Sequence, residues 1–150
     1  MLQRKQSLFL LVSFILLLIS LCLPFGHVEP EGMKFSGILT NLYIAYPNGI
    51  KDFRVTPLSI ILLLSLTVHI FTIFDYKNRK RQIKICNLLK ILGVLWIATF
   101  LILSHYIYRF ETFHPNLLGF LPFISLFFVR LAERAIKADE KLVKDADRIR

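Results

Sequence analysis

The sequence predicts an all-α integral membrane protein with four transmembrane helices, a small extracytoplasmic β-hairpin and a cytoplasmic C-terminal helix. Two observations lead to this fold class. The 150-residue chain is 55% hydrophobic and only 19% charged, and its apolar residues are gathered into four long runs. A helix needs about 20 apolar residues to cross a bilayer, whereas a soluble domain of this length would bury a single core without such runs.

The four predicted spans cover residues 8–25, 57–74, 88–108 and 116–132. The first follows a basic segment, MLQRKQS, so it has the layout of a signal peptide as well as that of a span. No A-x-A cleavage site follows it, because the first alanine of the chain is Ala45. We therefore expect an uncleaved span. Pro57 suits the first turn of the second span, and Pro122 is expected to kink the fourth.

Lysine and arginine are distributed unevenly between the two sides of this predicted bundle. Of the 19 basic residues, 15 lie on the side that holds both termini and the loop 75–87 between the second and third spans. The positive-inside rule places that side in the cytoplasm. The net charge of +9 therefore indicates topology, and we do not expect a nucleic-acid partner although the isoelectric point is near 9.8.

Residues 26–56 form the predicted outer loop. Its segment NLYIAYPNGIKDFRVT has strand-forming residues on both sides of a Pro-Asn-Gly turn, which predicts a hairpin. We expect the hairpin to cap the helix ends, and the alternative is pairing with a partner. The basic loop 75–87 has two interpretations as well: it only determines topology, which is favoured, or it binds anionic lipid headgroups.

The predicted spans contain no aspartate or glutamate, which argues against a proton pump or an ion-coupled carrier. Ser65, His69 and Thr72 are spaced i, i+4 and i+7 and therefore share one helix face. We expect them to form hydrogen bonds between helices rather than a polar pathway. Cys22 and Cys86 belong to opposite sides of the membrane and are not expected to form a disulfide.

We expect no catalytic residue, no metal-ligand set and no cofactor, because no triad, phosphate loop or metal-binding spacing is present. His27, His105 and His114 are the exception that keeps a second function open. All three are predicted at the outer face, where a cluster of imidazoles would suit a haem, a quinone headgroup or a metal ion.

Residues 133–150 are densely charged and predict a cytoplasmic helical tail that continues the fourth span. Alanine, leucine and isoleucine recur every three or four residues in it and form a narrow apolar stripe, which suits packing on another helix. Its acidic residues have an alternative role in ion pairs with Arg79, Lys80 and Arg81. The predicted partner-binding residues are Asp139, Glu140, Leu142, Val143, Asp147, Arg148 and Ile149.

The opening MLQRKQSLFLLVSFILLLISL, the four-span layout and the closing LAERAIKADEKLVKDADRIR resemble an uncharacterised bacterial family of small four-helix inner-membrane proteins, classed as a domain of unknown function. The most specific part is the tail, at Arg134, Ala135, Ile136, Asp139, Glu140, Leu142, Val143, Asp147 and Arg148. The resemblance implies a multi-pass protein of the bacterial inner membrane. It implies no activity, cofactor or catalytic residue.

Together these observations predict a non-catalytic accessory or scaffold subunit of a larger inner-membrane complex. Its expected partners are the lipid bilayer and other membrane proteins. The alternative is a subunit that binds haem or quinone through the outer histidines.

Overall fold

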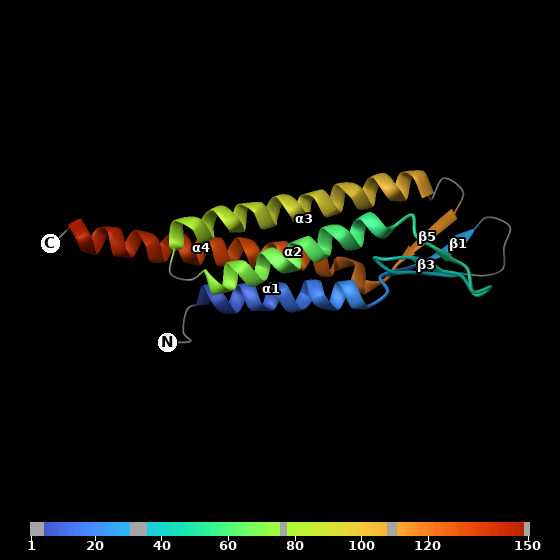
Figure 1. Cartoon of the computed structure of the whole chain (residues 1–150), viewed down its shortest axis with the longest axis horizontal. Helices are drawn as coiled ribbons and strands as arrows, with labels where there is room; N and C mark the ends of the chain where they lie inside the picture. The colour runs from blue at the N-terminus through green and yellow to red at the C-terminus, as the bar shows by residue number, and fades with distance from the viewer. Residues whose placement is uncertain (1–4, 31–35, 76–77, 108–110, 149–150) are drawn as a thin grey trace.

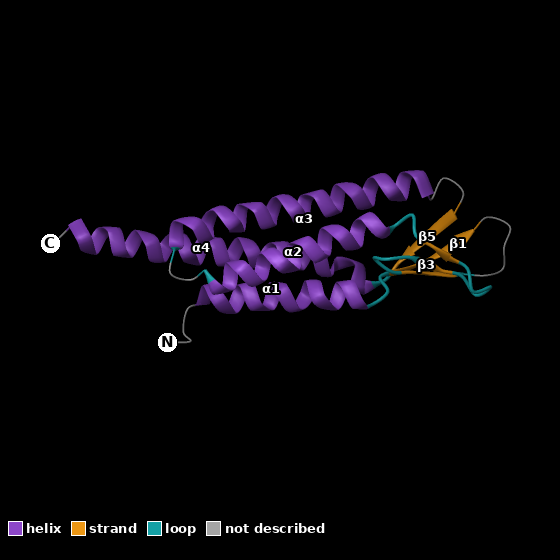
Figure 2. Ribbon diagram, viewed as in Figure 1, coloured by secondary structure: helices purple, strands orange, loops and turns teal. Residues whose placement is uncertain are grey.

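The computed structural model of the chain describes residues 5–30, 36–75, 78–107 and 111–148. Within these residues, four α-helices lie side by side and an antiparallel sheet lies at one end of them (Figure 1, Figure 2). The helices are α1 (Lys5–Cys22), α2 (Thr56–Phe74), α3 (Arg79–Ile107) and α4 (Leu121–Arg148), and a short 3-10 helix, η1 (Leu117–Phe120), precedes α4. The protein is therefore mostly helical, as predicted.

Helices α1, α2 and α3 are long and apolar enough to cross a membrane. Large hydrophobic side chains are exposed on their outer faces, among them Leu8 on α1, Leu63 on α2 and Ile91 and Val94 on α3. Soluble monomers rarely expose contiguous apolar surface on this scale. The exposed faces therefore suggest a membrane protein whose helices contact lipid.

Helix α4 differs from the other three because charged residues fill its second half. Its apolar part runs only from Leu121 to Ala132, which is shorter than the roughly 20 residues of a complete span. The predicted span at 116–132 was continuous, but its first turn is the 3-10 helix η1. The side chain of Asn116 starts that turn by accepting a hydrogen bond from the Leu117 amide, at 2.8 Å.

Two helices end or begin at other residues than the predicted spans. The first helix ends at Cys22 rather than at residue 25, because Pro24 cannot continue a helix and disfavours helical geometry in the residue before it. The segment 75–87 is mostly helix rather than loop, since α3 already begins at Arg79. Its first turn is closed by the Gln82 amide, which donates to the Asn78 carbonyl at 2.9 Å.

The sheet is larger than the predicted hairpin, so the all-α prediction was incomplete. The described strands are β1 (Gly26–Pro30), β2 (Gly37–Leu39), β3 (Ile44–Ala45), β4 (Lys51–Asp52) and β5 (Glu111–Pro115), in the spatial order β4-β3-β2-β1-β5. Strand β5 comes from the connection between α3 and α4 and pairs antiparallel with β1. This pairing joins segments that are far apart in the sequence, and no local pattern reports it.

Strands β3 and β4 form the hairpin that the Pro-Asn-Gly turn predicted. The Gly49 amide donates to the Tyr46 carbonyl at 3.0 Å, and Gly49 adopts a φ of 81°, which a side chain would disfavour. The Asn48 side chain accepts from the Ile50 amide at 3.1 Å. The turn chemistry of these residues therefore fixes the end of the hairpin.

The sheet packs on the helices through one buried amide and a set of aromatic rings. Asn41, fully buried between β2 and β3, donates to the Ser20 carbonyl of α1 at 2.7 Å and accepts from the Trp96 indole of α3 at 3.3 Å. The Trp96 and Phe100 rings are stacked, and Phe25 meets both edge-on just before β1. One continuous core therefore joins the bundle to the sheet.

Gly93 on α3 packs directly against Leu126 on α4. A Cβ atom at this position would lie 2.3 Å from Cδ2 and 2.7 Å from Cγ of Leu126. No side chain fits such a gap without movement of α4 or rotation of Leu126. The small residue therefore sets the spacing of these two helices.

We predict that Gly93→Ala lowers the free energy of unfolding by about 1–3 kcal/mol, measured by denaturant titration in detergent, because the added methyl group overpacks the contact. Gly119→Ala is the matched control, since its added Cβ would meet nothing closer than 3.4 Å. The double variant Gly93→Ala/Leu126→Ala should lose less unfolding free energy than the sum of the losses in the two single variants. An unchanged stability of Gly93→Ala would contradict this account of the α3–α4 contact.

Candidate functional site

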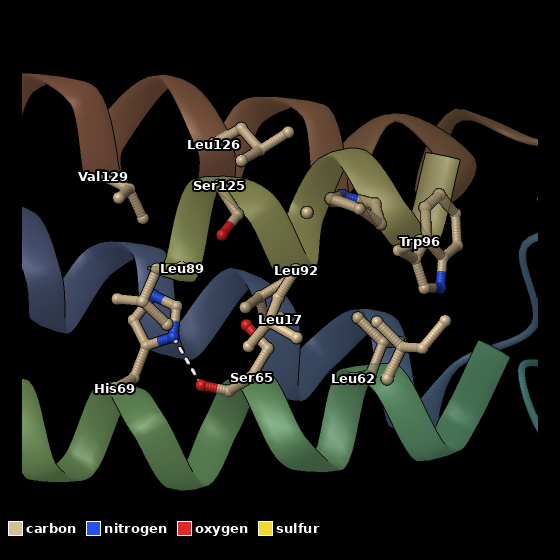
Figure 3. A pocket seen from close by; sticks show the side chains of 13 residues that line it. Leu17, Leu62, Ser65, His69, Leu89, Leu92, Trp96, Ser125, Leu126 and Val129 are labelled. Atoms are coloured by element: carbon tan, nitrogen blue, oxygen red, sulfur yellow. Dashed lines mark hydrogen bonds between the residues drawn. The ribbon is translucent and has the colours of Figure 1, made fainter. Parts of the chain in front are cut away.

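A buried polar cluster in the middle of the bundle joins three helices through the hydroxyl group of Ser13. Ser13 Oγ on α1 lies 2.9 Å from His69 Nε2 on α2 and 2.8 Å from Ser125 Oγ on α4. All three side chains are almost completely buried. Figure 3 shows His69 and Ser125 converging on the same space from α2 and α4.

The hydrogen-bond partners in this cluster indicate which atoms donate and which accept. His69 Nδ1 lies 2.8 Å from the Ser65 carbonyl, which only accepts, so Nδ1 carries the proton and donates. In a neutral imidazole Nε2 then accepts, and the Ser13 hydroxyl donates to it. The Ser125 hydroxyl in turn donates to Ser13 Oγ. Each polar group of the cluster therefore has a partner, as buried polar groups require.

The cavity next to this cluster is small. It is lined by Ser65, His69, Trp96, Ser125 and apolar side chains, and it offers about 10 Å³ to the centre of a water-sized sphere (Figure 3). That volume suits about one water molecule. Ligand pockets usually measure about 300–1,000 Å³, so this space does not admit a haem or a quinone.

The cluster belongs to a longer buried seam. Ser65, His69 and Thr72 are all buried on one face of α2, as their spacing predicted, and His69 makes the expected bond to another helix. Sequence analysis missed Ser13 and Ser125. The missed signal lies in α1, where Gln6, Ser13 and Ser20 recur every seven residues inside an apolar run and are all buried. Such a spacing keeps polar groups on one helix face.

A buried carboxylate group, that of Glu133, joins α3 to α4. Glu133 lies 2.6 Å from the Lys90 ammonium of α3 and 2.5 Å from that of Lys137, one turn further along α4. Burial alone would raise the pKa of Glu133, but the hydrogen bonds from Lys137 and Lys90 outweigh it and hold the pKa of this carboxyl below its usual value. The three groups together carry one excess positive charge.

Two arginines of the predicted basic segment 75–87 form hydrogen bonds within the chain. Arg81 pairs with Asp75 through two hydrogen bonds, and these bonds hold the pKa of the Asp75 carboxyl below its usual range. Arg79 donates to the backbone carbonyl of Asp139 at 2.9 Å rather than to a tail carboxylate. Lys80 is exposed on the first turn of α3.

The three histidines that were predicted at the outer face are not gathered into one site. His27 and His114 are register partners on β1 and β5, and His114 Nε2 lies 3.8 Å from a Glu29 carboxylate oxygen. His105 lies in the last turn of α3 beside Tyr106. Across residues 5–30, 36–75, 78–107 and 111–148, no group of three histidine, cysteine or acidic side chains is arranged to hold a metal ion. Cys22 is exposed, Cys86 is buried, and both are free.

The predicted partner-binding residues lie in the second half of α4, which extends past the other helices (Figure 1). Asp139 and Glu140 are half-buried, whereas Leu142 and Val143 are 69% and 45% exposed. Asp147 and Arg148 belong to the last turn of α4, and Ile149 lies outside the described residues. The tail is therefore open to solvent at Leu142, which belongs to its apolar stripe, and at the neighbouring Val143.

These features define a small membrane-type protein: a helix bundle with a polar seam, an antiparallel sheet at one end and a charged helix that projects from the other. The chain belongs to the DUF4293 family, described as a domain of unknown function, and the family model matches residues 2–149. The resemblance to an uncharacterised family is thereby confirmed. A search of curated proteins finds no match to the chain.

We predict that Ser13→Ala lowers the free energy of unfolding by about 0.6–1.7 kcal/mol, the range measured for hydrogen bonds between membrane helices. The change leaves His69 Nε2 without its donor and removes one of the two acceptors of the Ser125 hydroxyl, which keeps the backbone carbonyl of residue 13 at 3.3 Å. Ser104→Ala is the matched control, because its exposed hydroxyl bonds only within its own helix, to Leu101. Denaturant titration of both variants in detergent measures the difference, and equal effects would contradict a special role for Ser13.

Proposed function

We propose that the protein is a non-catalytic accessory or scaffold subunit of a larger complex in the bacterial inner membrane. Four spans anchor it, the sheet lies on the outer side, and both termini are cytoplasmic. The uneven distribution of lysine and arginine supports this orientation. The positions of α1 and α4 agree with it, because α1 begins and α4 ends at the end of the bundle away from the sheet (Figure 1).

The fourth span consists of η1 and the apolar part of α4. Its length alone is short for a bilayer, but its packing supports a position inside the membrane. Ser125 of α4 shares the buried cluster with α1 and α2, and Leu126 contacts Gly93 of α3. The segment therefore packs against α1 and α3, two of the helices that are apolar enough to cross, and Glu133 follows it at the inner boundary together with Lys90.

One observation carries the scaffold proposal: the last turns of α4, beyond Asp139, extend past the bundle and leave Leu142 and Val143 uncovered, whereas Ile136 is still buried in it. Leu142 and Val143 are exposed, and the helix that bears them continues in line from the membrane-embedded part of α4. An apolar stripe on a charged helix is suited to pack on a partner helix. Burial of such a side chain contributes about 1.5–3 kcal/mol, so a few contacts suffice for association.

The alternative proposal is a subunit that binds haem or quinone through outer histidines. Its support is the register of β1 and β5, which holds His27 opposite His114. Both imidazoles are exposed on the sheet rather than enclosed, which leaves a large flat cofactor without the apolar pocket that it normally occupies. We therefore favour the scaffold proposal.

We predict that Leu142→Ser/Val143→Ser abolishes co-purification of the partner protein after gentle detergent extraction, while insertion and bundle stability stay unchanged. Lys141→Ser is the control, because it changes an exposed residue of the same turn and leaves the apolar stripe intact. If the double variant retains every associated protein, the tail is not a docking helix. A Soret absorption band in the purified protein would favour the haem alternative instead.

A further inference from the structure

The surface of α3 carries a groove that neither the family assignment nor the proposed scaffold role explains. This groove is shallow and largely open, and it is lined by Asn87, Lys90, Ile91 and Val94. These residues are spaced i, i+3, i+4 and i+7, so they form one continuous strip of the helix surface. The strip is about 10 Å long at the usual rise of 1.5 Å per residue.

The chemistry of the groove changes along its length. Asn87 and Lys90 form the end nearer the start of α3, and Ile91 and Val94, both more than 60% exposed, form the other end. Because α3 leads from the charged end of the bundle toward the sheet, the polar end faces the headgroup region and the apolar end faces the hydrocarbon (Figure 1). A phospholipid has the same order of polar and apolar parts.

The charge at the polar end selects the kind of headgroup. Lys90 and Lys137 share a single carboxylate, that of Glu133, at 2.6 and 2.5 Å. The Lys90 ammonium has three N–H donors, so it can serve Glu133 and a second acceptor together. The excess positive charge and the amide of Asn87 together favour a phosphate oxygen of a lipid with net negative charge.

We propose that this groove is a binding site for one anionic phospholipid of the cytoplasmic leaflet, with its phosphate at Lys90 and Asn87 and an acyl chain along Ile91 and Val94. The inference rests on the membrane placement proposed above but not on the docking role of the tail. The site differs from a general attraction of lipid to the basic residues at the start of α3, because its apolar end also contributes.

Native mass spectrometry of the full chain in detergent tests the site, with phosphatidylglycerol and phosphatidylcholine added in equal amounts. We expect preferential retention of phosphatidylglycerol. Lys90→Gln should reduce this preference about five-fold, the ratio that corresponds to ~1 kcal/mol for one basic residue near an anionic surface. Lys80→Gln, the same charge change on the exposed first turn of α3, should leave it nearly unchanged.

Two further variants distinguish a specific lipid-binding site from non-specific electrostatic attraction. Glu133→Gln removes the shared carboxylate and should increase retention of phosphatidylglycerol. Val94→Trp fills the exposed apolar end without changing charge and should lower retention of both lipids. Equal retention of the two lipids by the unmodified chain, equal effects of Lys90→Gln and Lys80→Gln, or an unaffected Val94→Trp variant would each overturn the proposal. Tail variants should not alter lipid retention, so this result is independent of the scaffold test.

Discussion

The hydroxyl group of Ser13 is the contact on which the arrangement of the helices depends. It joins α1 to His69 of α2 and to Ser125 of α4 in the middle of the bundle. In lipid, burial of apolar side chains gives little drive for helices to associate, because the hydrocarbon is as apolar as leucine. Close packing and hydrogen bonds between helices must then select one arrangement, and Ser13 satisfies two neighbours with a single small side chain.

The same face of α1 also positions the sheet. Ser20 lies seven residues after Ser13 on that face, and its carbonyl accepts from the buried amide of Asn41. The Asn41 carbonyl oxygen in turn accepts from the Trp96 indole of α3, where the aromatic rings begin. Helix packing and sheet position are therefore coupled through α1, and α3 is held to the others by Gly93 on one side and by this contact on the other.

The elements that were predicted from the sequence depend on local patterns. Apolar runs predicted α2 almost to the residue, and turn chemistry predicted the β3–β4 hairpin, because both signals lie within the segment itself. Strand β5 was missed because it ends in Pro115 and pairs with the distant β1, so no local turn signal marks it. The cluster was half predicted: the spacing on α2 indicated a polar face, but the choice of Ser13 and Ser125 as partners depends on how the helices assemble.

The charged second half of α4 answers a question that the composition raises, namely why an apolar chain ends in a polar helix. Glu133 marks the change, since it is the first acidic residue after the apolar part of α4 and is neutralised by Lys90 and Lys137. Beyond Asp139, charged residues predominate on the helix while Leu142 and Val143 are exposed. The central claim is thus that α4 is one helix in two environments.

Spin labels placed along α4 in lipid nanodiscs test this claim directly. The measured quantities are the collision rates of each label with oxygen and with a nickel chelate. Oxygen concentrates in hydrocarbon, whereas the chelate is soluble in water. Labels go to Phe127 and Leu142, both exposed, in a chain whose Cys22 and Cys86 are replaced by serine and alanine. The account predicts that oxygen dominates at position 127 and the nickel chelate at position 142. A label at position 127 that meets the nickel chelate as readily as the label at position 142 would contradict it.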